Sequence, residues 1–301
     1  MNEQFTLPDG TIVGTGNIEP TEEQLLLCKS DYRVFGEDYY LDKSDIEKLL
    51  KGDRYKDLRK QRAKFVLNQG RLGKCNASAA VAGLHQIRES AGLPTKVLSD
   101  CHLYMKINGG GDNGSLLIDG FRELGKNGVS TRRIEHAGKA YLIPDNVHLK
   151  RQIPREWLDV ANKVALEYKT FEAFTLPDDY ATFKIAVASA LARDYPIVFA
   201  WHVGANGMRL SNGYVNNARG VGNHANLAHS AKWVGGEDLV HPDNQNSWGP
   251  SIDPMYGPTS GGWGEGGFGL FTMESFFRCR RNHMFWVLVG ATQEKSASPL
   301  A

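Results

Sequence analysis

The sequence predicts an α+β protein in which helices come first and strands second. Three segments with helical patterns precede Pro196, and after it the chain changes to short apolar runs separated by glycine and asparagine. This order favours an antiparallel sheet or barrel over a repeated β-α-β unit. The length of 301 residues and the hydrophobic content of 41% indicate one large globular domain or two small ones.

The N-terminal region differs from the rest of the chain. Pro8-Asp9-Gly10 is typical of the turn of a small hairpin. Ser44 to Glu47 form a capping box, which predicts a short helix over 45–51 that ends at Gly52. Residues 54–64 are rich in lysine and arginine, and we interpret them as a solvated connecting face.

The remaining elements follow from the apolar pattern. Helices are predicted over 76–91, where Val81, Leu84 and Ile87 have helical spacing in an alanine-rich buried segment, and over 115–126 and 183–192. Strands are predicted over 197–203, 224–233, 269–273 and 285–289. The polar residues 291–301 are expected to form a flexible tail.

Charge and apolar runs exclude several classes of partner. With 35 Lys+Arg against 34 Asp+Glu, the formal net charge is +1, so we expect no nucleic acid and no anionic membrane as a partner. No run approaches the roughly 18 apolar residues of a membrane helix. Residues 1–5 lack the features of a signal peptide, which predicts a cytoplasmic protein. A virion location is the alternative if a phage encodes the chain.

Cysteine and histidine spacing predicts neither a metal site nor a cofactor. The four cysteines have no CxxC pair, which argues against a zinc site and a disulfide scaffold and favours a reducing compartment. We interpret Cys28, Cys101 and Cys279 as structural thiols. The histidines show no HExxH spacing, and no Lys-Ser or Lys-Thr follows the glycines at 109–111, so a phosphate loop is not indicated.

Cys75 ends a loop with two glycines and opens the alanine-rich helix. A thiol at a helix N-terminus has a lowered pKa, because the positive end of the helix dipole and unpaired N–H groups stabilise the thiolate. The same N–H groups can bind the oxyanion of a tetrahedral intermediate, and the Gln69 amide can add a further donor. This placement predicts a nucleophile.

A base and an orienting residue follow later in the chain. His224 opens a predicted strand, and Asn246 can accept a hydrogen bond from its ring, with Trp248 shielding that bond from water. His229 is the one rival for the base. Five residues separate the two histidines, so on a regular strand they face opposite sides, and we favour His224.

These segments together resemble the papain-like (C1 family) cysteine peptidases, in the form seen more in bacterial and phage members without the usual disulfides. The resemblance covers about 65–289 and rests on Asn-Gln-Gly at 68–70 through Cys75, Asn-His-Ala at 223–225, Asn-Ser-Trp-Gly at 246–249 and the glycine-rich 262–268. It implies a two-lobed fold, with a helical left lobe, an antiparallel β-barrel right lobe and the active cleft between them.

The resemblance also implies residue roles, with no cofactor. Cys75 is the implied nucleophile and His224 the general base and then acid, with Asn246 orienting the ring. Gln69 and the Cys75 backbone N–H form the implied oxyanion hole. The implied substrate-binding residues are Asn113, Gly114, Ala200, Ala225 and Trp248. Two alanines at the second subsite predict a preference for a bulky apolar P2 residue.

Three departures accompany the resemblance. Leu72 stands where the family usually has a cysteine of its first disulfide, and Lys74 and Asn76 flank the nucleophile where small and aromatic residues are usual. We expect Lys74 to favour the thiolate further and Asn76 to change the shape of a subsite.

The implied organisation has an N-terminal extension over 1–62, which is a prosegment or docking arm, and a peptidase domain over 63–295. The lobes span about 63–180 and 181–290. The extension lacks the helical inhibitory signature of family propeptides, so we favour an arrangement in which it does not cover the cleft.

The leading hypothesis is an endopeptidase that hydrolyses polypeptides through a Cys75 thioester. The alternative is a papain-fold structural or binding component of a larger assembly, such as a phage virion, with other subunits as partners and an idle or covered site. Acyl transfer to an amine uses the same residues. A covered Cys75 favours the alternative, and an open cleft favours the enzyme.

Overall fold

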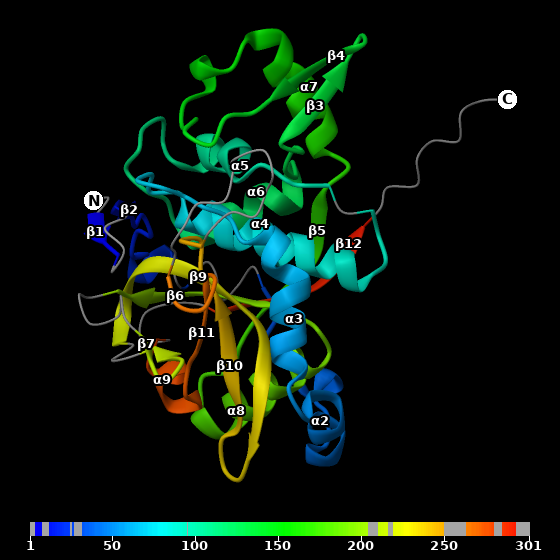
Figure 1. Cartoon of the computed structure of the whole chain (residues 1–301), viewed down its shortest axis with the longest axis vertical. Helices are drawn as coiled ribbons and strands as arrows, with labels where there is room; N and C mark the ends of the chain where they lie inside the picture. Colours follow the sequence, from blue (N-terminus) through cyan, green and yellow to red (C-terminus); the bar gives the residue numbers. More distant parts are fainter. Residues whose placement is uncertain are drawn as a thin grey trace, which may run out of the picture.

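A group of helices packs against a large sheet, and Figure 1 shows the two halves one above the other. The computed structural model describes residues 4–7, 12–24, 26, 32–94, 96–203, 210–215, 219–249, 263–279 and 285–292. The predicted α+β class is confirmed. Within the described ranges, no helix is long and apolar enough to cross a membrane.

The described strands form one large sheet and two hairpins. The sheet has the order β5-β12-β6-β9-β10-β11-β8-β7, and its neighbours are antiparallel except β11 and β8. Its strands are β5 (Lys169–Thr175), β6 (Ile197–His202), β7 (Leu210–Ser211), β8 (Tyr214–Val215), β9 (Arg219–Gly235), β10 (Leu239–Gln245), β11 (Phe268–Leu270) and β12 (Trp286–Thr292). The hairpins pair β1 (Gln4–Thr6) with β2 (Ile12–Gly14) and β3 (Arg133–His136) with β4 (Lys139–Leu142).

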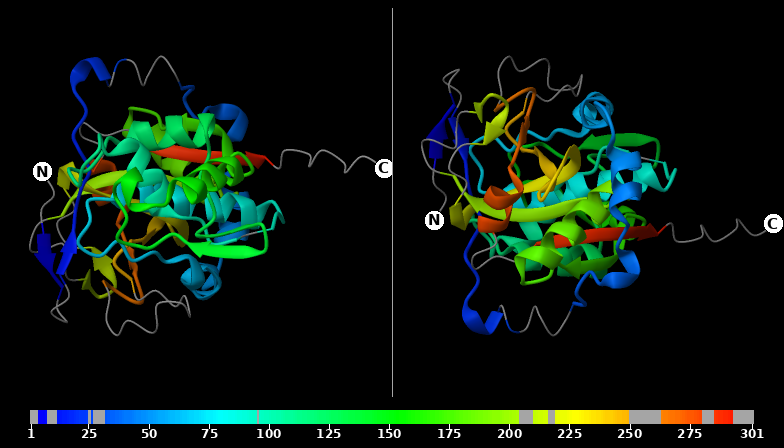
Figure 2. Two further views of the ribbon diagram at one scale, coloured as in Figure 1. Left: turned by 90° about the horizontal axis from the view of Figure 1, so that it is seen from above. Right: turned by 90° about the horizontal axis from the view of Figure 1, so that it is seen from below.

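The described α-helices lie on both sides of this sheet. They are α2 (Lys43–Leu50), α3 (Arg54–Arg62), α4 (Cys75–Ser90), α5 (Asp100–Ile107), α6 (Leu117–Lys126), α7 (Arg155–Ala165), α8 (Tyr180–Ala192) and α9 (Met273–Arg278). Figure 2 shows β12, in red, crossing the middle of the molecule with helices on either side. Its Trp286 and Leu288 pack in the cluster around α4, whereas Val287 belongs to the cluster around α8.

The three main predicted helices are confirmed as α4, α6 and α8. Helix α2 begins at Lys43 with Asp42 as its N-cap and makes no side-chain cap bond, so the predicted capping box at Ser44 is wrong. Gly52 has a φ of 76°, which confirms the expected left-handed end. Sequence reasoning missed α5, which Ser99 caps by accepting from the His102 N–H, and α7.

The predicted strands are confirmed in β6, β9 and β12. The antiparallel pairing of β1 with β2 is that of the predicted N-terminal hairpin, and its turn at 8–10 lies outside the described residues. The strand predicted over 269–273 is wrong past Leu270, because Thr272 accepts a hydrogen bond from the Ser275 N–H and caps α9 instead. Strand β10 was missed because Pro242, Asp243 and Asn244 are residues that strands disfavour. Residues 293–301 and Cys28 lie outside the described part of the chain.

Helix α4 is the central element and positions the candidate site. Its side chains are buried from Cys75 to Arg88, as the alanine-rich pattern predicted. At Gly83 the helix presses against the sheet so closely that a Cβ would lie 2.6 Å from Leu288 Cδ1. This contact fixes the middle of α4 against the strands.

Helix α3 is anchored by Arg59 and Arg62, for which the interpretation of residues 54–64 as a solvated face is wrong. Lys56, Asp57 and Lys60 are exposed, as that interpretation expects. Arg59 makes two hydrogen bonds to the Asp243 carboxylate, at 2.7 Å from Nε and 2.6 Å from Nη2. Arg62 bonds Asp194 at 3.0 Å and the His229 carbonyl at 2.6 Å. Arg59 and Arg62, which the sequence pattern assigns to solvent, therefore hold α3 on the sheet.

Candidate active site

Cys75 is the first residue of α4 and follows a loop that is tied to the other half of the molecule. The Gln69 N–H donates to the Ser247 carbonyl at 2.9 Å, and Asn68 forms a β-bridge with Trp248. The Ser247 hydroxyl also donates to Gln69 Oε1. The loop before the nucleophile candidate and the Asn-Ser-Trp-Gly segment are thus held side by side.

His224 lies near the start of β9 with its ring fully buried. Its Nε2 is 2.8 Å from Asn246 Oδ1, and its ring stacks on Trp248 with centroids 4.0 Å apart and planes 15° apart. Asn246 Oδ1 can only accept, so the proton lies on Nε2 and Nδ1 is the lone-pair nitrogen. Among the described residues, Nδ1 has no hydrogen-bond partner.

The structure brings Cys75 to the same place. The backbone N–H of Ala225, the residue after His224, donates a hydrogen bond to the Cys75 sulfur. Cys75, His224, Asn246, Gln69 and Trp248 therefore share one region between α4 and the sheet. His229 does not, because Asp243 at 2.9 Å and Arg62 at 3.2 Å hold its ring beside α3.

The N-terminal segment 14–18 fills this region, contrary to the arrangement that the sequence favoured. The Gly14 N–H donates to the Gly70 carbonyl at 2.9 Å. The Gly14 carbonyl accepts from Gln69 Nε2 at 2.7 Å and from Trp248 Nε1 at 3.2 Å. Gln69 Nε2 also donates to the Leu72 carbonyl at 2.9 Å, so the amide of the expected oxyanion hole is already occupied.

The next residues of this segment lie against the expected substrate-binding loop. The Ser115 N–H donates to the Gly16 carbonyl at 2.8 Å, the Ile18 N–H to the Ser115 carbonyl at 2.9 Å, and the Asn17 N–H to the Asn223 carbonyl at 3.1 Å. These bonds hold the segment between Asn223 and Ser115, and Asn17 forms a single parallel β-bridge with Ser115. At Gly16 only glycine fits, because a Cβ there would lie 2.0 Å from the Gly73 oxygen, and the sequence around Gly16 does not indicate this contact.

The expected substrate-binding residues are covered to different degrees. Asn113 is exposed, whereas Gly114 is buried and packs on Gly16, with a position for a Cβ only 2.2 Å from the Gly16 oxygen. Ala200 and Ala225 face each other across the β6–β9 pair and are fully buried. Asn76 donates from Nδ2 to the Ser115 carbonyl at 2.6 Å, so it braces the loop.

Burial sets the protonation of the two central groups. It raises the pKa of the Cys75 thiol to about 11, although the N–H groups of Ala225, Gly16, Asn76 and Cys75 act in the opposite direction. Burial likewise lowers the pKa of His224 to about 3, although its hydrogen bonds to Asn246 and Asn226 act in the opposite direction. The predicted lowering of the thiol pKa is therefore wrong for this covered state, in which both groups are neutral.

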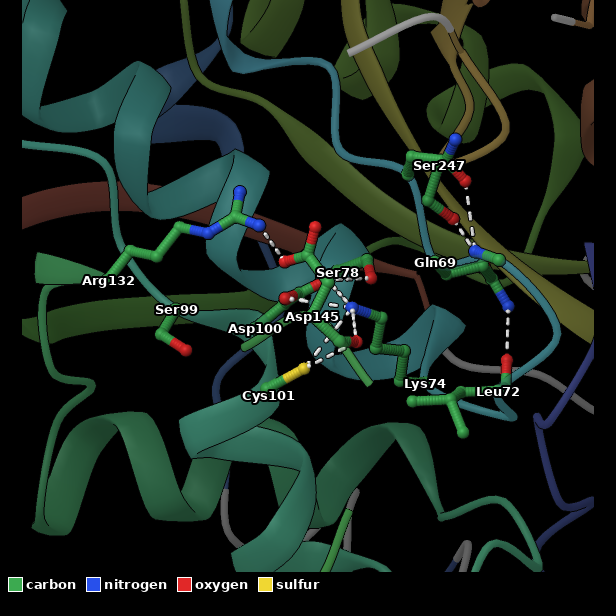
Figure 3. Close-up of polar contacts among 12 residues, drawn as sticks. Gln69, Leu72, Lys74, Ser78, Ser99, Asp100, Cys101, Arg132, Asp145 and Ser247 are labelled. Atoms are coloured by element: carbon green, nitrogen blue, oxygen red, sulfur yellow. Dashed lines mark hydrogen bonds and ion pairs between the residues drawn. The ribbon is translucent and has the colours of Figure 1, made fainter. Parts of the chain in front are cut away.

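Lys74 does not face the sulfur of its neighbour. Its ammonium group is buried away from the cleft and pairs with Asp100, with Nζ 3.1 Å from Oδ2 (Figure 3). The pKa of Cys75 responds to burial and to backbone N–H groups, and this lysine is not among its causes. The expectation that Lys74 favours the thiolate is thus not supported by its position.

Comparison with known proteins places this geometry in a structural class. The chain superposes on xylellain, a cysteine protease from Xylella fastidiosa, with a TM-score of 0.58 and 20% identity over 92% of this chain and 96% of that one. The chain has the papain-like fold. A recombinant stem bromelain precursor superposes with a TM-score of 0.54 and 18% identity, over 93% of this chain and 83% of that one. A bromelain protease from Ananas comosus superposes with a TM-score of 0.51 and 19% identity, over 75% of this chain and 93% of that one.

The likeness is one of fold. No family model matches the sequence, and no curated protein matches it either. The predicted papain-like architecture is confirmed. Figure 1 shows α4, α5, α6 and α7 in one half, and in the other half the strands β6, β9, β10 and β11 together with the helices α2, α3, α8 and α9.

Proposed function

We propose that this protein is a papain-like cysteine endopeptidase held in a latent state by its own N-terminal segment. The observation that carries the proposal is the pair formed by His224 Nε2 and Asn246 Oδ1 at 2.8 Å, beside a cysteine at the first position of α4. That pair leaves Nδ1 as the lone-pair nitrogen that takes the thiol proton.

In the proposed reaction, the Cys75 thiolate attacks the carbonyl carbon of a peptide bond. Gln69 and the Cys75 N–H stabilise the oxyanion, and the His224 imidazolium protonates the leaving amine. His224 then takes a proton from water, which attacks the thioester and releases the acid. Asn246 keeps the ring in its tautomer, and Trp248 keeps water from that bond. The substrate is a polypeptide with a bulky apolar P2 residue.

Residues 1–62 act as the covering extension in this proposal, and residues 63–295 form the peptidase, with lobes at about 63–180 and 181–290. Burial disfavours the thiolate and the imidazolium, so in the covered state the proton stays on the Cys75 sulfur and His224 stays neutral. Departure of residues 14–18 would return water to the cleft, free the Gln69 amide and remove the burial that raises the thiol pKa.

Gly16→Ala tests this proposal in the full chain. The added Cβ would meet the Gly73 backbone oxygen at 2.0 Å, so the segment cannot stay seated. We expect an epoxide inhibitor of papain-like enzymes to label Cys75 at least about tenfold faster than in the wild type, which corresponds to roughly 1.4 kcal/mol. Mass spectrometry gives the rate and the modified residue, and turnover of a fluorogenic peptide follows on the same sample.

Gly125→Ala is the matched control, because nothing lies within 4 Å of a Cβ at that helical position. It should label like the wild type, and Cys75→Ala should show neither labelling at this position nor turnover. Peptidase activity that survives Cys75→Ala at the level of its parent would refute the assignment.

The covered cleft also favours a second candidate function, a papain-fold binding or structural module. Cys75 and His224 are fully buried, as such a module permits. It is the better description if Cys75 in Gly16→Ala reacts with iodoacetamide but no peptide is cleaved. Turnover that appears only with an added amine would instead indicate acyl transfer.

A further inference from the structure

Lys74 belongs to a buried charge cluster next to the candidate nucleophile, and Figure 3 shows its members converging on the ammonium group. Nζ lies 3.2 and 3.1 Å from the two Asp100 carboxylate oxygens, 3.0 Å from the Asp145 carbonyl and 3.3 Å from Cys101 Sγ. The side chains of Lys74 and Asp100 are only 1% and 6% exposed. An ammonium group has three donors, and these contacts use all of them.

The carboxylate that holds Lys74 also holds the first turn of α4. Asp100 Oδ2 accepts from the Ser78 hydroxyl at 2.7 Å, and the Ser78 N–H donates to the Lys74 carbonyl at 2.9 Å. Residues 74 and 78 are thus fixed to one side chain of α5. Cys75 lies between these two points, so its backbone N–H and the direction of its side chain are fixed with them.

The Lys74 ammonium already occupies the position that a metal ion would take in this cluster. The donor atoms of Asp100, Cys101 and Asp145 lie within 4.8 Å of one another. The Lys74 ammonium, however, already sits against Asp100 and Cys101. Burial lowers and the Asp100 charge raises the pKa of Lys74, and the net shift is upward, so the group stays charged.

Stability alone does not explain such a pair. Taking two charges out of water costs several kcal/mol, and an uncharged pair of similar volume is often as stable. A buried ion pair with directed hydrogen bonds differs from an uncharged pair mainly in the geometry that it enforces. Here that geometry is the backbone on both sides of Cys75.

We propose that the Lys74–Asp100 ion pair is a positioning device, which fixes the Cys75 sulfur and its backbone N–H in the geometry that the reaction requires. Neither residue touches the reacting atoms. The inference rests on the proposed peptidase function, and a misplacement of about 1 Å in such a site can lower the rate about 100-fold.

The test replaces both charges at once, by Lys74→Met with Asp100→Asn, in the full chain carrying Gly16→Ala. The asparagine keeps an acceptor for Ser78. We expect the double variant to unfold at a midpoint near that of its parent, and its amide exchange over 74–78 to be at least about tenfold faster than in the parent. Its kcat should be about 10- to 100-fold lower, with KM changed less than about twofold. Ser78→Ala, a milder change, should shift exchange and kcat in the same direction.

The matched control removes an exposed pair, by Arg278→Met with Glu274→Gln on α9, where the side chains are 63% and 62% exposed. It should change none of these quantities. A stable double variant with parental exchange and kcat would overturn the inference. If Gly16→Ala itself never turns over, the peptidase proposal fails, and the exchange rates over 74–78 alone decide whether the pair fixes this turn.

Discussion

Asp112 joins the nucleophile loop to the substrate-binding loop through a single carboxylate oxygen. Its Oδ1 accepts from the Gly73 N–H at 2.8 Å and from the Tyr104 hydroxyl at 2.7 Å. The Tyr104 oxygen in turn accepts from the Gly114 N–H at 3.2 Å. Burial and the neighbouring Asp112 raise the pKa of Tyr104. Leu72 cannot form a disulfide here, and hydrogen bonds make the connection between the loops instead.

Asp112→Ala should therefore destabilise the protein more than Asp112→Asn. Alanine leaves the Gly73 N–H and the Tyr104 hydroxyl without their acceptor, which costs about 1–3 kcal/mol of unfolding free energy. Asparagine keeps an oxygen at the same place. Urea unfolding of the two variants measures the difference, and equal midpoints would show that these bonds contribute nothing to stability.

At the scale of elements, α3 is held by charges that the sheet buries. Asp243 is fully buried and is contacted by Arg59 at 2.6 Å and by His229 at 2.9 Å. Without Arg59, most of the positive charge facing this carboxylate is lost, because burial lowers the pKa of His229 and keeps its ring neutral. The anchor of α3 is thus also the main compensation for a buried charge.

Arg59→Ala is expected to lower the unfolding free energy by about 3 kcal/mol, the range found when one partner of a buried pair is removed. Lys60→Ala on the same helix is the control. Its pair with Asp57 is 79% and 68% exposed, and such pairs contribute less than about 1 kcal/mol. Chemical denaturation compares the two variants, and an equal loss would contradict the buried-anchor interpretation.

Over the whole molecule, buried histidines couple stability to pH. Burial lowers the pKa from 6.5 to about 4 for His85 and to about 3 for His102 and His224. The folded pKa lies below the unfolded one in each case, so the unfolded chain binds more protons between these values. The stabilisation is present above pH 6.5 and is lost as the pH falls toward 4.

As the pH falls below 6.5, the unfolding free energy should decrease by about 1 kcal/mol per pH unit for each of these histidines. Urea midpoints at about pH 7.5 and about pH 5 measure this slope. The same argument predicts faster Cys75 labelling at the lower pH, because His224 must be neutral while the segment 14–18 covers it. A flat stability profile would show that these rings are not buried in solution.

The sequence by itself determined the α+β class, the buried helix that begins at Cys75, and the strand that carries His224. These features follow from apolar periodicity, from the residues at helix ends and from short motifs that are each local in the chain. The resemblance carried by the same motifs implied the grouping of Cys75, His224 and Asn246.

Only the tertiary structure decided what covers and braces that group. The seat of Gly16 against Gly73, the Lys74–Asp100 pair and the Arg59–Asp243 anchor each join residues far apart in the chain. Nothing in the local pattern around a charged or glycine residue indicates a partner, because burial and complementary charge arise only when distant segments meet. The same burial raises the pKa of the Cys75 thiol, whereas its position at a helix N-terminus alone predicts a lowered pKa.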